Sequence, residues 1–283
     1  MLIGVPKEIK SDEYRIGLTP ESVAELAKNG HQVLIEQNGG LGIGKDNQAY
    51  MDAGAEIVET REEIFQRAEM IVKVKEPQLD ECALLQSNQI LFTYLHLAPD
   101  PDQVKALLSS DCRAIAYESV KDNDGAYPLL TPMSEVAGRM AVQAGATCLE
   151  KAKGGLGRLI GGVTNVEPAE VVVIGGGVVG YNSIEIALGM QANVTVLDKS
   201  AQRLDQLESI FGDKLNAVIA TEENNKIYVE SADIVIGAVL IPGASAPKLI
   251  TRDLVKSMKK GSVIVDVAID QGGCSETSRA TTH

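Results

Sequence analysis

The residues best suited to chemistry in this chain surround a glycine-rich turn. Residues 171–180 read V-V-V-I-G-G-G-V-V-G, so a short apolar run leads into the spacing G-x-G-x-x-G at Gly175, Gly177 and Gly180. Glycines at this spacing allow a tight turn, let a pyrophosphate approach the backbone, and let the following helix pack closely on the strand. The next apolar run ends in a carboxylate, Asp198, about 20 residues further on, where an acid can accept hydrogen bonds from ribose hydroxyls. The pattern therefore predicts a dinucleotide site.

The residues around this turn also bear on which cofactor is expected. An apolar-periodic helix follows the glycines, and the free N–H groups at its start favour phosphates. The carboxylate of Asp198 repels a 2′-phosphate, so we expect NAD rather than NADP, although the nearby Lys199 and Arg203 weaken that preference. A Rossmann-type unit that has lost its ligand remains an alternative interpretation.

Four further charged residues lie at or near the ends of expected strands, where ligands of open parallel sheets gather. Two of them are Arg15, in the loop after the first strand, and His96, at the end of the apolar run I-L-F-T-Y-L. An arginine in such a loop either clamps a carboxylate through two hydrogen bonds or is a solvated loop residue. A histidine there either transfers protons or is structural.

The other two are Lys75 and Asp270. Lys75 closes the strand I-V-K-V-K, in which alternation places Lys73 on the same face, so a ligand-binding surface and a solvated edge both remain open. Asp270 ends V-I-V-D-V-A-I-D before a glycine turn, where it is a catalytic candidate or the first residue of an Asx turn. Asp266, inside that strand, is expected to be a hydrogen-bonded structural carboxylate.

Composition and missing motifs exclude several classes of function. The chain has none of the patterns G-x-S-x-G, H-E-x-x-H or the P-loop, which disfavours hydrolases, zinc proteases and kinases. Four scattered cysteines without a C-x-x-C pair predict neither disulfides nor a metal site, and fit the cytoplasm. A net charge of −13 argues against a nucleic-acid partner. We expect no signal peptide and no membrane span, because no apolar run is long enough.

The elements that must position these residues alternate between strand and helix. At 283 residues the chain suits about two domains. In the first part we expect strands at 2–5, 31–36, 57–58, 70–75, 90–95 and 113–118, and helices at 20–29, 46–53, 61–68 and 101–109. In the second part we expect a long helix at 131–152, a glycine-rich loop at 154–162, and strands at 170–174, 193–197, 233–237 and 262–267.

This alternation predicts an α/β fold: two Rossmann-like α/β domains with parallel sheets, joined by the long helix. Residues 1–128 are expected to form the substrate domain and residues 129–283 the NAD-binding domain. In two-domain proteins of this kind the active site usually lies in the interdomain cleft, and we expect it there.

Longer segments carry a resemblance that covers essentially the whole chain. They are G-V-P-K-E-I-K-S-D-E-Y-R, K-V-K-E-P, L-F-T-Y-L-H-L-A, P-M-S-E-V-A-G-R, G-G-V-x-x-V-E-P-A, I-G-A-V-L-I-P-G-A-S-A-P-K-L and V-D-V-A-I-D-Q-G-G-C. In these segments the chain resembles the bacterial alanine dehydrogenases, in the family that also holds the transhydrogenase alpha subunits. The resemblance implies a homohexamer that converts L-alanine reversibly to pyruvate and ammonium with NAD.

The resemblance also implies roles for individual residues. Arg15 and Lys75 would hold the substrate, His96 would be the acid and base at the substrate oxygen, and Asp270 would assist proton transfer with water and ammonia. The cofactor contacts implied are Ser134, Gly175, Gly177, Val178, Val179, Gly180, Asp198, Arg203, Val239, Leu240, Val267, Ala268, Ile269, Asp270 and Arg279. Ala220 stands where the family has a serine, with Thr221 beside it.

Members of that family continue beyond the position of His283, with a segment that contacts NAD and a part that returns to the first domain. We therefore expect the last strand and helices of the second sheet to be missing, and this chain alone to be poorly active. Two other interpretations remain open: the NAD-binding subunit of a proton-translocating transhydrogenase, and an NAD-binding remnant without turnover.

Overall fold

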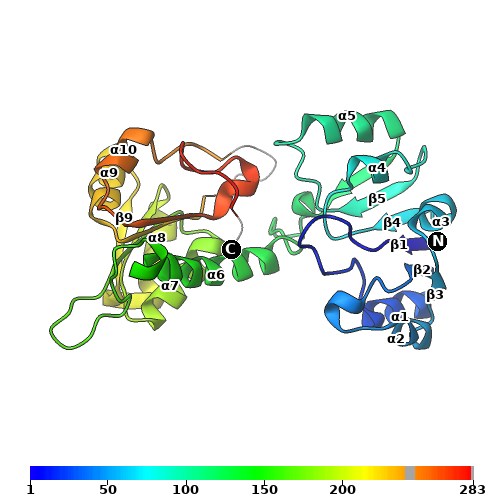
Figure 1. The fold of residues 1–283 in the computed structure, drawn as a ribbon, viewed down its shortest axis with the longest axis horizontal. Coiled ribbons are helices and arrows are strands. Elements are labelled where there is room, and N and C mark those ends of the chain that lie inside the picture. Colours follow the sequence, from blue (N-terminus) through cyan, green and yellow to red (C-terminus); the bar gives the residue numbers. More distant parts are fainter. Residues whose placement is uncertain (240–245, 282–283) are drawn as a thin grey trace. The chain divides into compact units, whose positions relative to one another are not determined.

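The computed structural model describes residues 1–239 and 246–281, with Asp270 described by its backbone alone. The chain divides into two compact units, Met1–Tyr127 and Pro128–His283. Each unit contains a parallel β-sheet with helices packed against it (Figure 1). The prediction of two parallel-sheet α/β domains is confirmed.

The described first unit has a six-stranded sheet in the order β3-β2-β1-β4-β5-β6. Its strands are β1 (Leu2–Val5), β2 (Gln32–Glu36), β3 (Glu56–Val58), β4 (Met70–Val72), β5 (Ile90–Thr93) and β6 (Arg113–Ala116). Its helices are α1 (Pro20–Lys28), α2 (Asn47–Asp52), α3 (Arg61–Arg67), α4 (Leu79–Cys82) and α5 (Pro101–Ser110), with the 3₁₀ turns η1 (Leu41–Ile43) and η2 (Tyr117–Ser119). This strand order is the doubly wound order of the Rossmann fold.

Three strands of the first unit end two or three residues earlier than the apolar runs predict. Side chains replace strand pairing at their carboxyl ends. After β4 the amide of Val74 donates to the Glu8 carboxylate, with 2.6 Å between N and Oε1. After β5 the amides of Leu95 and His96 both donate to the Glu118 carboxylate. The predicted strands therefore give way to loops where polar side chains meet.

The described second unit has a five-stranded sheet in the order β11-β10-β7-β8-β9. Its strands are β7 (Glu170–Ile174), β8 (Asn193–Asp198), β9 (Leu215–Ile219), β10 (Ile234–Gly237) and β11 (Val263–Asp266). Its helices are α6 (Thr131–Leu149), α7 (Val178–Gly189), α8 (Ala201–Phe211), α9 (Glu222–Ser231) and α10 (Arg252–Ser257), with the 3₁₀ turns η3 (Lys151–Lys153), η4 (Gly212–Lys214) and η5 (Val267–Gln271). The analysis of the sequence did not predict β9, which lies at an edge of the sheet.

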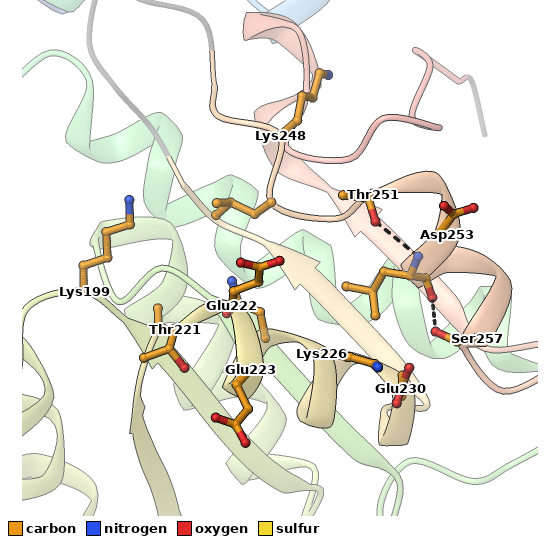
Figure 2. A pocket seen from close by; sticks show the side chains of 14 residues that line it. Lys199, Thr221, Glu222, Glu223, Lys226, Glu230, Lys248, Thr251, Asp253 and Ser257 are labelled. Atoms are coloured by element: carbon orange, nitrogen blue, oxygen red, sulfur yellow. Dashed lines mark hydrogen bonds between the residues drawn. The ribbon is translucent and has the colours of Figure 1, made fainter.

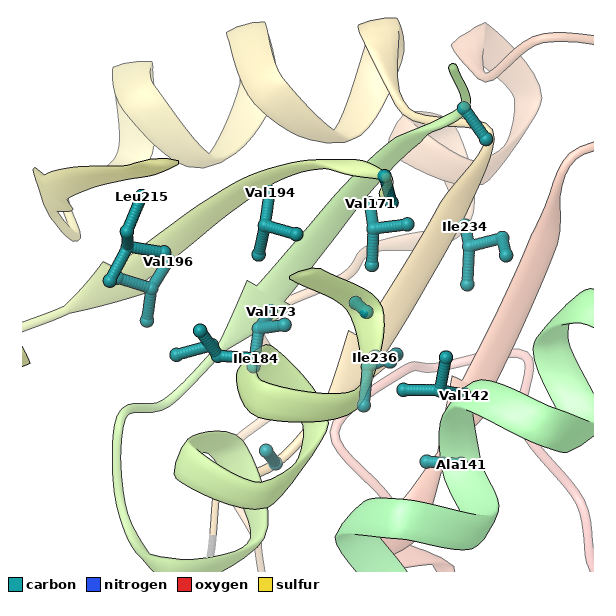
Figure 3. Close-up of a cluster of buried hydrophobic side chains, with 14 of the residues drawn as sticks. Ala141, Val142, Val171, Val173, Ile184, Val194, Val196, Leu215, Ile234 and Ile236 are labelled. Carbon is teal, nitrogen blue, oxygen red and sulfur yellow. The ribbon is translucent and has the colours of Figure 1, made fainter. Parts of the chain in front are cut away.

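Both faces of this second sheet are covered, so its central strands β7 and β10 are apolar apart from Glu170 at the start of β7. On one face, residues of β7, β8 and β10 pack against Ile184 of α7 and Val142 of α6 (Figure 3). On the other face, Val172 and Ile174 pack with Val229 of α9. The long helix α6 belongs to this second unit, where the Ser183 hydroxyl of α7 donates to its Gly138 carbonyl over 3.0 Å. The core thus fixes the carboxyl ends of β7, β8 and β10 relative to α7.

Candidate active site

The glycine turn after β7 has the geometry that its spacing predicts. Gly175 has a φ of +102°, which side chains rarely allow, and a Cβ there would lie 2.9 Å from the carbonyl oxygen of Ala238. A Cβ on Gly180 would lie 1.8 Å from the carbonyl oxygen of Gly175, so helix and turn are in direct contact. A Cβ on Gly177 would meet no atom within 4 Å. Gly175 and Gly180 are therefore packed against backbone carbonyls, whereas the space beside Gly177 is open.

Asp198, the last residue of β8, is bonded to this turn. Its Oδ2 accepts from the Gly176 amide over 2.6 Å, and its Oδ1 accepts from the Ser200 amide over 2.8 Å. Arg203 lies beside it, and its Nε donates to the Gly176 carbonyl oxygen over 2.6 Å. The carboxylate is held in one orientation at the carboxyl edge of the sheet.

The remaining residues expected to contact a cofactor are distributed over several elements. Val178 and Val179 form the first turn of α7, and Ser134 lies in the first turn of α6. Val239 follows β10, and Val267, Ala268 and Ile269 form the 3₁₀ turn after β11. Arg279 is exposed near the end of the described chain, and Leu240 lies outside the described residues. Because parallel strands end at one edge, the residues after β7, β8, β10 and β11 share an edge of the sheet.

A cavity of about 1000 Å³ opens beside the strand end that carries Asp198 (Figure 2). Lys199, which follows β8, lines it together with Ala220 and Thr221, which follow β9. Residues of α9 and α10 complete the lining, including the acidic Glu222 and Asp253. The Thr221 hydroxyl oxygen accepts from the Asn224 amide over 3.0 Å, which leaves its proton available to a ligand.

The turn after η5 is held by two charged side chains. Asp266 accepts from the amides of Cys274 and Ser275, each over 3.1 Å, as expected for a structural carboxylate. Lys248 donates to the carbonyl oxygens of Gly273, over 2.8 Å, and of Ser275, over 3.1 Å. The backbone of Asp270 lies within η5, at the start of this clamped turn. Its side chain is outside the described part, so its role stays a prediction.

In the first unit, Arg15 and Lys75 act on one carboxylate. Arg15 donates from Nε and Nη2 to the two oxygens of Glu13, over 2.8 and 2.6 Å. Burial alone would raise the pKa of Glu13, but the hydrogen bonds from Arg15 and the charge of Lys75 lower it. The two cations therefore lie near each other, and Glu13 orients the guanidinium of Arg15. The Lys75 carbonyl oxygen accepts from the Thr93 hydroxyl over 2.9 Å, which ties this residue to β5.

His96 follows β5, which is the neighbour of β4 in the sheet. Its ring stacks on Tyr94, with centroids 6.0 Å apart and planes 22° apart. Burial raises the pKa of Tyr94, while the nearby charge of Arg15 lowers it, so Tyr94 lies near both Arg15 and His96. His96 has a φ of +47°, an unusual value for a residue with a side chain, and the bonds from its own amide and that of Leu95 to Glu118 hold it there.

Lys73 does not share a surface with Lys75, so the prediction from strand alternation is wrong. Its side chain is fully buried, and its Nζ donates to Glu8 over 3.1 Å and to Glu81 over 2.8 Å. A buried lysine needs such partners, because an unpaired charge in a protein interior is costly. Lys73 is thus a structural cation between two carboxylates, whereas Lys75 is half-buried in the loop that follows.

The sequence indicated Arg15, Lys75 and His96, which follow β1, β4 and β5, three neighbouring strands of the first sheet. Reasoning from the sequence missed Tyr94, Glu76 and Glu118, which contact or support His96. Tyr94 and Glu76 adjoin the predicted residues in Y-L-H and K-V-K-E-P, so neighbouring polar residues were the available signal. Glu118 had no such signal, because only strand pairing places it beside β5.

Among the described residues, no group of three or more histidine, cysteine or acidic side chains is placed to hold a metal ion. None of the helices in residues 1–239 and 246–281 combines the length and the hydropathy that a membrane span requires.

Comparison with known proteins gives matches over nearly the whole chain. The family model "Alanine dehydrogenase/PNT, N-terminal domain" matches residues 4–137, and "Alanine dehydrogenase/PNT, C-terminal domain" matches residues 141–283. An alanine dehydrogenase of Methanococcus maripaludis is 55% identical over 100% of this chain and 76% of its own length. One of Bacillus subtilis is 53% identical over 100% of this chain and 75% of its own length.

Solved structures agree with these matches. An L-alanine dehydrogenase superposes with a TM-score of 0.90 at 48% identity, covering 100% of this chain and 78% of that one. A transhydrogenase from Sinorhizobium meliloti superposes with a TM-score of 0.83 at 26% identity, covering 99% of this chain and 81% of that one. Both units of the chain are thus matched in sequence and in fold. The chain belongs to the alanine dehydrogenase/PNT family.

Proposed function

We propose that this chain catalyses the reversible NAD-dependent oxidative deamination of L-alanine to pyruvate and ammonium. The observation that carries the proposal is the grouping of Arg15, Lys75 and His96 in the first unit of a chain whose second unit has a dinucleotide turn. Two cations suit an anionic substrate, and a histidine suits the proton transfers that accompany loss of ammonia. Relatives that are named alanine dehydrogenase and are about half identical to the chain support the same conclusion.

The second unit fits NAD. The open side of Gly177 leaves room for the pyrophosphate, and the amides at the start of α7 can donate to it. Asp198 would accept from the adenosine ribose, and the cavity beside Lys199 and Thr221 would take the adenine end. When bound, NAD accepts the hydride that leaves the Cα of alanine. The other contacts proposed are those that the family resemblance implies for α6, η5 and Arg279.

The first unit would hold the substrate. Arg15, oriented by Glu13, and Lys75 would bind the carboxylate and the carbonyl region of alanine or pyruvate. His96 would exchange a proton with the substrate oxygen, since it follows β5 beside the strand that Lys75 follows, and its ring stacks on Tyr94. Asp270 would assist the proton transfers of water and ammonia. Each step asks of these residues only binding, orientation or movement of a proton.

The direct test is NADH formation from NAD and L-alanine by the purified chain. Arg15→Ala should raise KM for alanine by at least tenfold, and His96→Ala should lower kcat by a hundredfold or more. Arg113→Ala is the matched control, because Arg113 is exposed on β6 and bonds Asn88 over 2.9 Å. Alanine-independent turnover, or NAD binding without any turnover, would overturn the proposal.

A second candidate is hydride transfer between nicotinamide cofactors, which the match to a transhydrogenase at 26% identity favours. Such a reaction needs no amino-acid pocket, so the first-unit cations argue against it. Reduction of a nicotinamide analogue by NADH in the absence of alanine would support this second function. If this second function is correct, Arg15→Ala should leave the rate of that reduction unchanged.

We also propose that the chain assembles into a homohexamer, as the family resemblance implies, and acts in the cytoplasm. Its four cysteines are free and scattered along the sequence, which suits a reducing compartment. Light scattering of the purified protein tests the assembly. A monomer at micromolar concentration would contradict it.

A further inference from the structure

We propose that Glu76 is the positioning residue for His96: it keeps the ring in the form protonated at Nδ1, so that Nε2 is the nitrogen that exchanges a proton with the substrate. The inference rests on the proposed function only for what Nε2 does, and not for how the ring is held. Glu76 immediately follows Lys75, so one loop would supply both a substrate cation and the partner of the acid–base group.

The geometry gives each oxygen of Glu76 its own partner. Oε2 lies 3.2 Å from Nδ1 of His96, and Oε1 accepts from Nζ of Lys10. The side chains of Glu76 and His96 are only 13% and 15% exposed, so water competes weakly for these bonds. Lys10 occupies one oxygen and thereby directs the other toward the imidazole.

The ionisation of Glu76 sets the direction of the bond to His96. Burial alone would raise the pKa of Glu76, but the hydrogen bonds from His96 and Lys10 outweigh it and hold the pKa at about 2. An ionised carboxylate can only accept hydrogen bonds, so Nδ1 must carry the proton. A neutral imidazole protonated at Nδ1 has its lone pair at Nε2.

Other groups around the ring do not set its tautomer. Tyr94 stacks against its face, Glu118 bonds only backbone amides, and Lys10 acts through Glu76. Within the described part of the chain, Glu76 is the residue shown bonded to a ring nitrogen. Tyr94 and Glu118 fix where the ring lies, and Glu76 fixes which nitrogen is basic.

The proton transfer balances without another reactant. When the carbinolamine, with its amino group protonated, collapses, its O–H bond breaks and an Nε2–H bond forms on His96. The O–H electron pair forms the C=O bond of pyruvate, and the C–N bond breaks with its pair on nitrogen, so that ammonia leaves. The ring becomes an imidazolium, whose charge the Glu76 carboxylate stabilises across Nδ1 without itself taking the proton. In the reverse direction the same nitrogen returns the proton to the oxygen.

Nitrogen-15 NMR of histidine-labelled protein tests this assignment without substrate or cofactor. The chain has three histidines, and loss of one set of signals in His96→Ala identifies those of His96. We expect the neutral ring of the wild type to show protonated Nδ1 and unprotonated Nε2. Glu76→Gln should mix the two tautomers, because an amide can both donate and accept.

Lys10→Gln provides a second test. It leaves the Glu76 carboxylate in place, so the ring should keep its proton at Nδ1. Glu56→Gln is the matched control, because Glu56 is paired with Arg67 over 2.8 Å and should leave the His96 signals unchanged. In turnover, Glu76→Gln should lower kcat tenfold or more with little change in KM, and Glu76→Asp should recover part of it.

The outcomes separate this inference from the proposed function. A ring protonated at Nε2 in the wild type, or a tautomer unchanged in Glu76→Gln, overturns the assignment even if alanine is oxidised. The expected tautomer in a protein that oxidises no alanine upholds the assignment and overturns the proposed function.

Discussion

The amide of Gly176 donates a hydrogen bond to Oδ2 of Asp198, with 2.6 Å between the two atoms. This bond joins the glycine turn after β7 to the acid at the end of β8. The second carboxylate oxygen is held by the amide of Ser200. Two backbone donors thus hold the Asp198 carboxylate in one orientation, which favours a ribose hydroxyl and disfavours a 2′-phosphate.

Asp198→Asn should therefore reduce discrimination between the two nicotinamide cofactors. We expect NAD affinity to fall about tenfold and NADP affinity to stay equal or rise, because the repelling charge is gone. Isothermal titration with both cofactors measures the ratio. Asp205→Asn, at an exposed position on α8, is the control, and an unchanged NAD-to-NADP ratio in Asp198→Asn would contradict the assignment.

Gly177→Ala separates cofactor binding from stability. A methyl group at Gly177 meets no protein atom, so Tm should hold within about 2 °C, whereas NAD affinity should fall tenfold or more as the methyl takes the room of the pyrophosphate. Gly180→Ala should instead destabilise the unit by about 2 kcal/mol or more, because its methyl would overlap the Gly175 carbonyl.

Gly189→Ala controls for the helix itself, since Gly189 ends α7 and its Cβ would also meet no atom within 4 Å. It should change neither Tm nor NAD affinity. Normal NAD binding by Gly177→Ala would show that the cofactor does not approach this turn.

Lys73→Met should destabilise the first unit strongly. It leaves Glu8 and Glu81 buried without their cation. Removing one partner of a buried ion pair typically lowers the free energy of unfolding by about 3–5 kcal/mol. Urea unfolding followed by circular dichroism measures the loss. Lys105→Met removes an ion pair that is about three-quarters exposed and should change stability by less than about 1 kcal/mol. Equal effects of the two substitutions would show that Lys73 is not a structural cation.

The acid sensitivity of stability should depend on Glu76. Its pKa of about 2 lies below the ordinary value of 4.5, so its ionised form stabilises the fold above pH 4.5, and that contribution is lost as the pH falls toward 2. The gap in unfolding free energy between wild type and Glu76→Gln should be about 1–3 kcal/mol at neutral pH and should shrink over this range.

Glu36→Gln should show the opposite slope. Burial raises the pKa of Glu36, against the weaker opposing effects of Lys7 and Arg61, so the wild-type carboxyl is favoured when protonated. The variant should gain stability relative to wild type as the pH rises above 4.5. Parallel slopes for Glu36→Gln and Glu76→Gln would contradict both pKa directions.

Most of the fold was predictable because its apolar runs and glycines are local signals. The N-cap at Thr19 and the run from Val171 to Ile174 each predicted their element. β9 was missed because Asn216 interrupts the apolar run of an edge strand. The early ends of β4 and β5 were missed because Glu8 and Glu118, distant in sequence, take the amides that strand pairing would have used.

In the candidate site, the sequence predicted the charged residues but not the side chains that hold them. Arg15, Lys75 and His96 carry the resemblance and follow strands, so the sequence indicated them. The groups that hold them did not stand out, because Glu13, Glu76 and Glu118 look like ordinary loop acids until the fold places them beside their partners. The burial of Lys73 was likewise invisible to an alternation argument, since its two partners lie on other elements.

The most direct test of the central claim follows the hydrogen on the Cα of L-alanine. The chain is incubated with NAD and L-alanine deuterated at Cα in ordinary water, and the NADH is analysed by mass spectrometry. We predict that deuterium passes to the nicotinamide, one atom per pyruvate formed, with a rate that falls a hundredfold or more in His96→Ala. Pyruvate or NADH formed without transfer of the label, or at an unchanged rate in His96→Ala, would contradict the account.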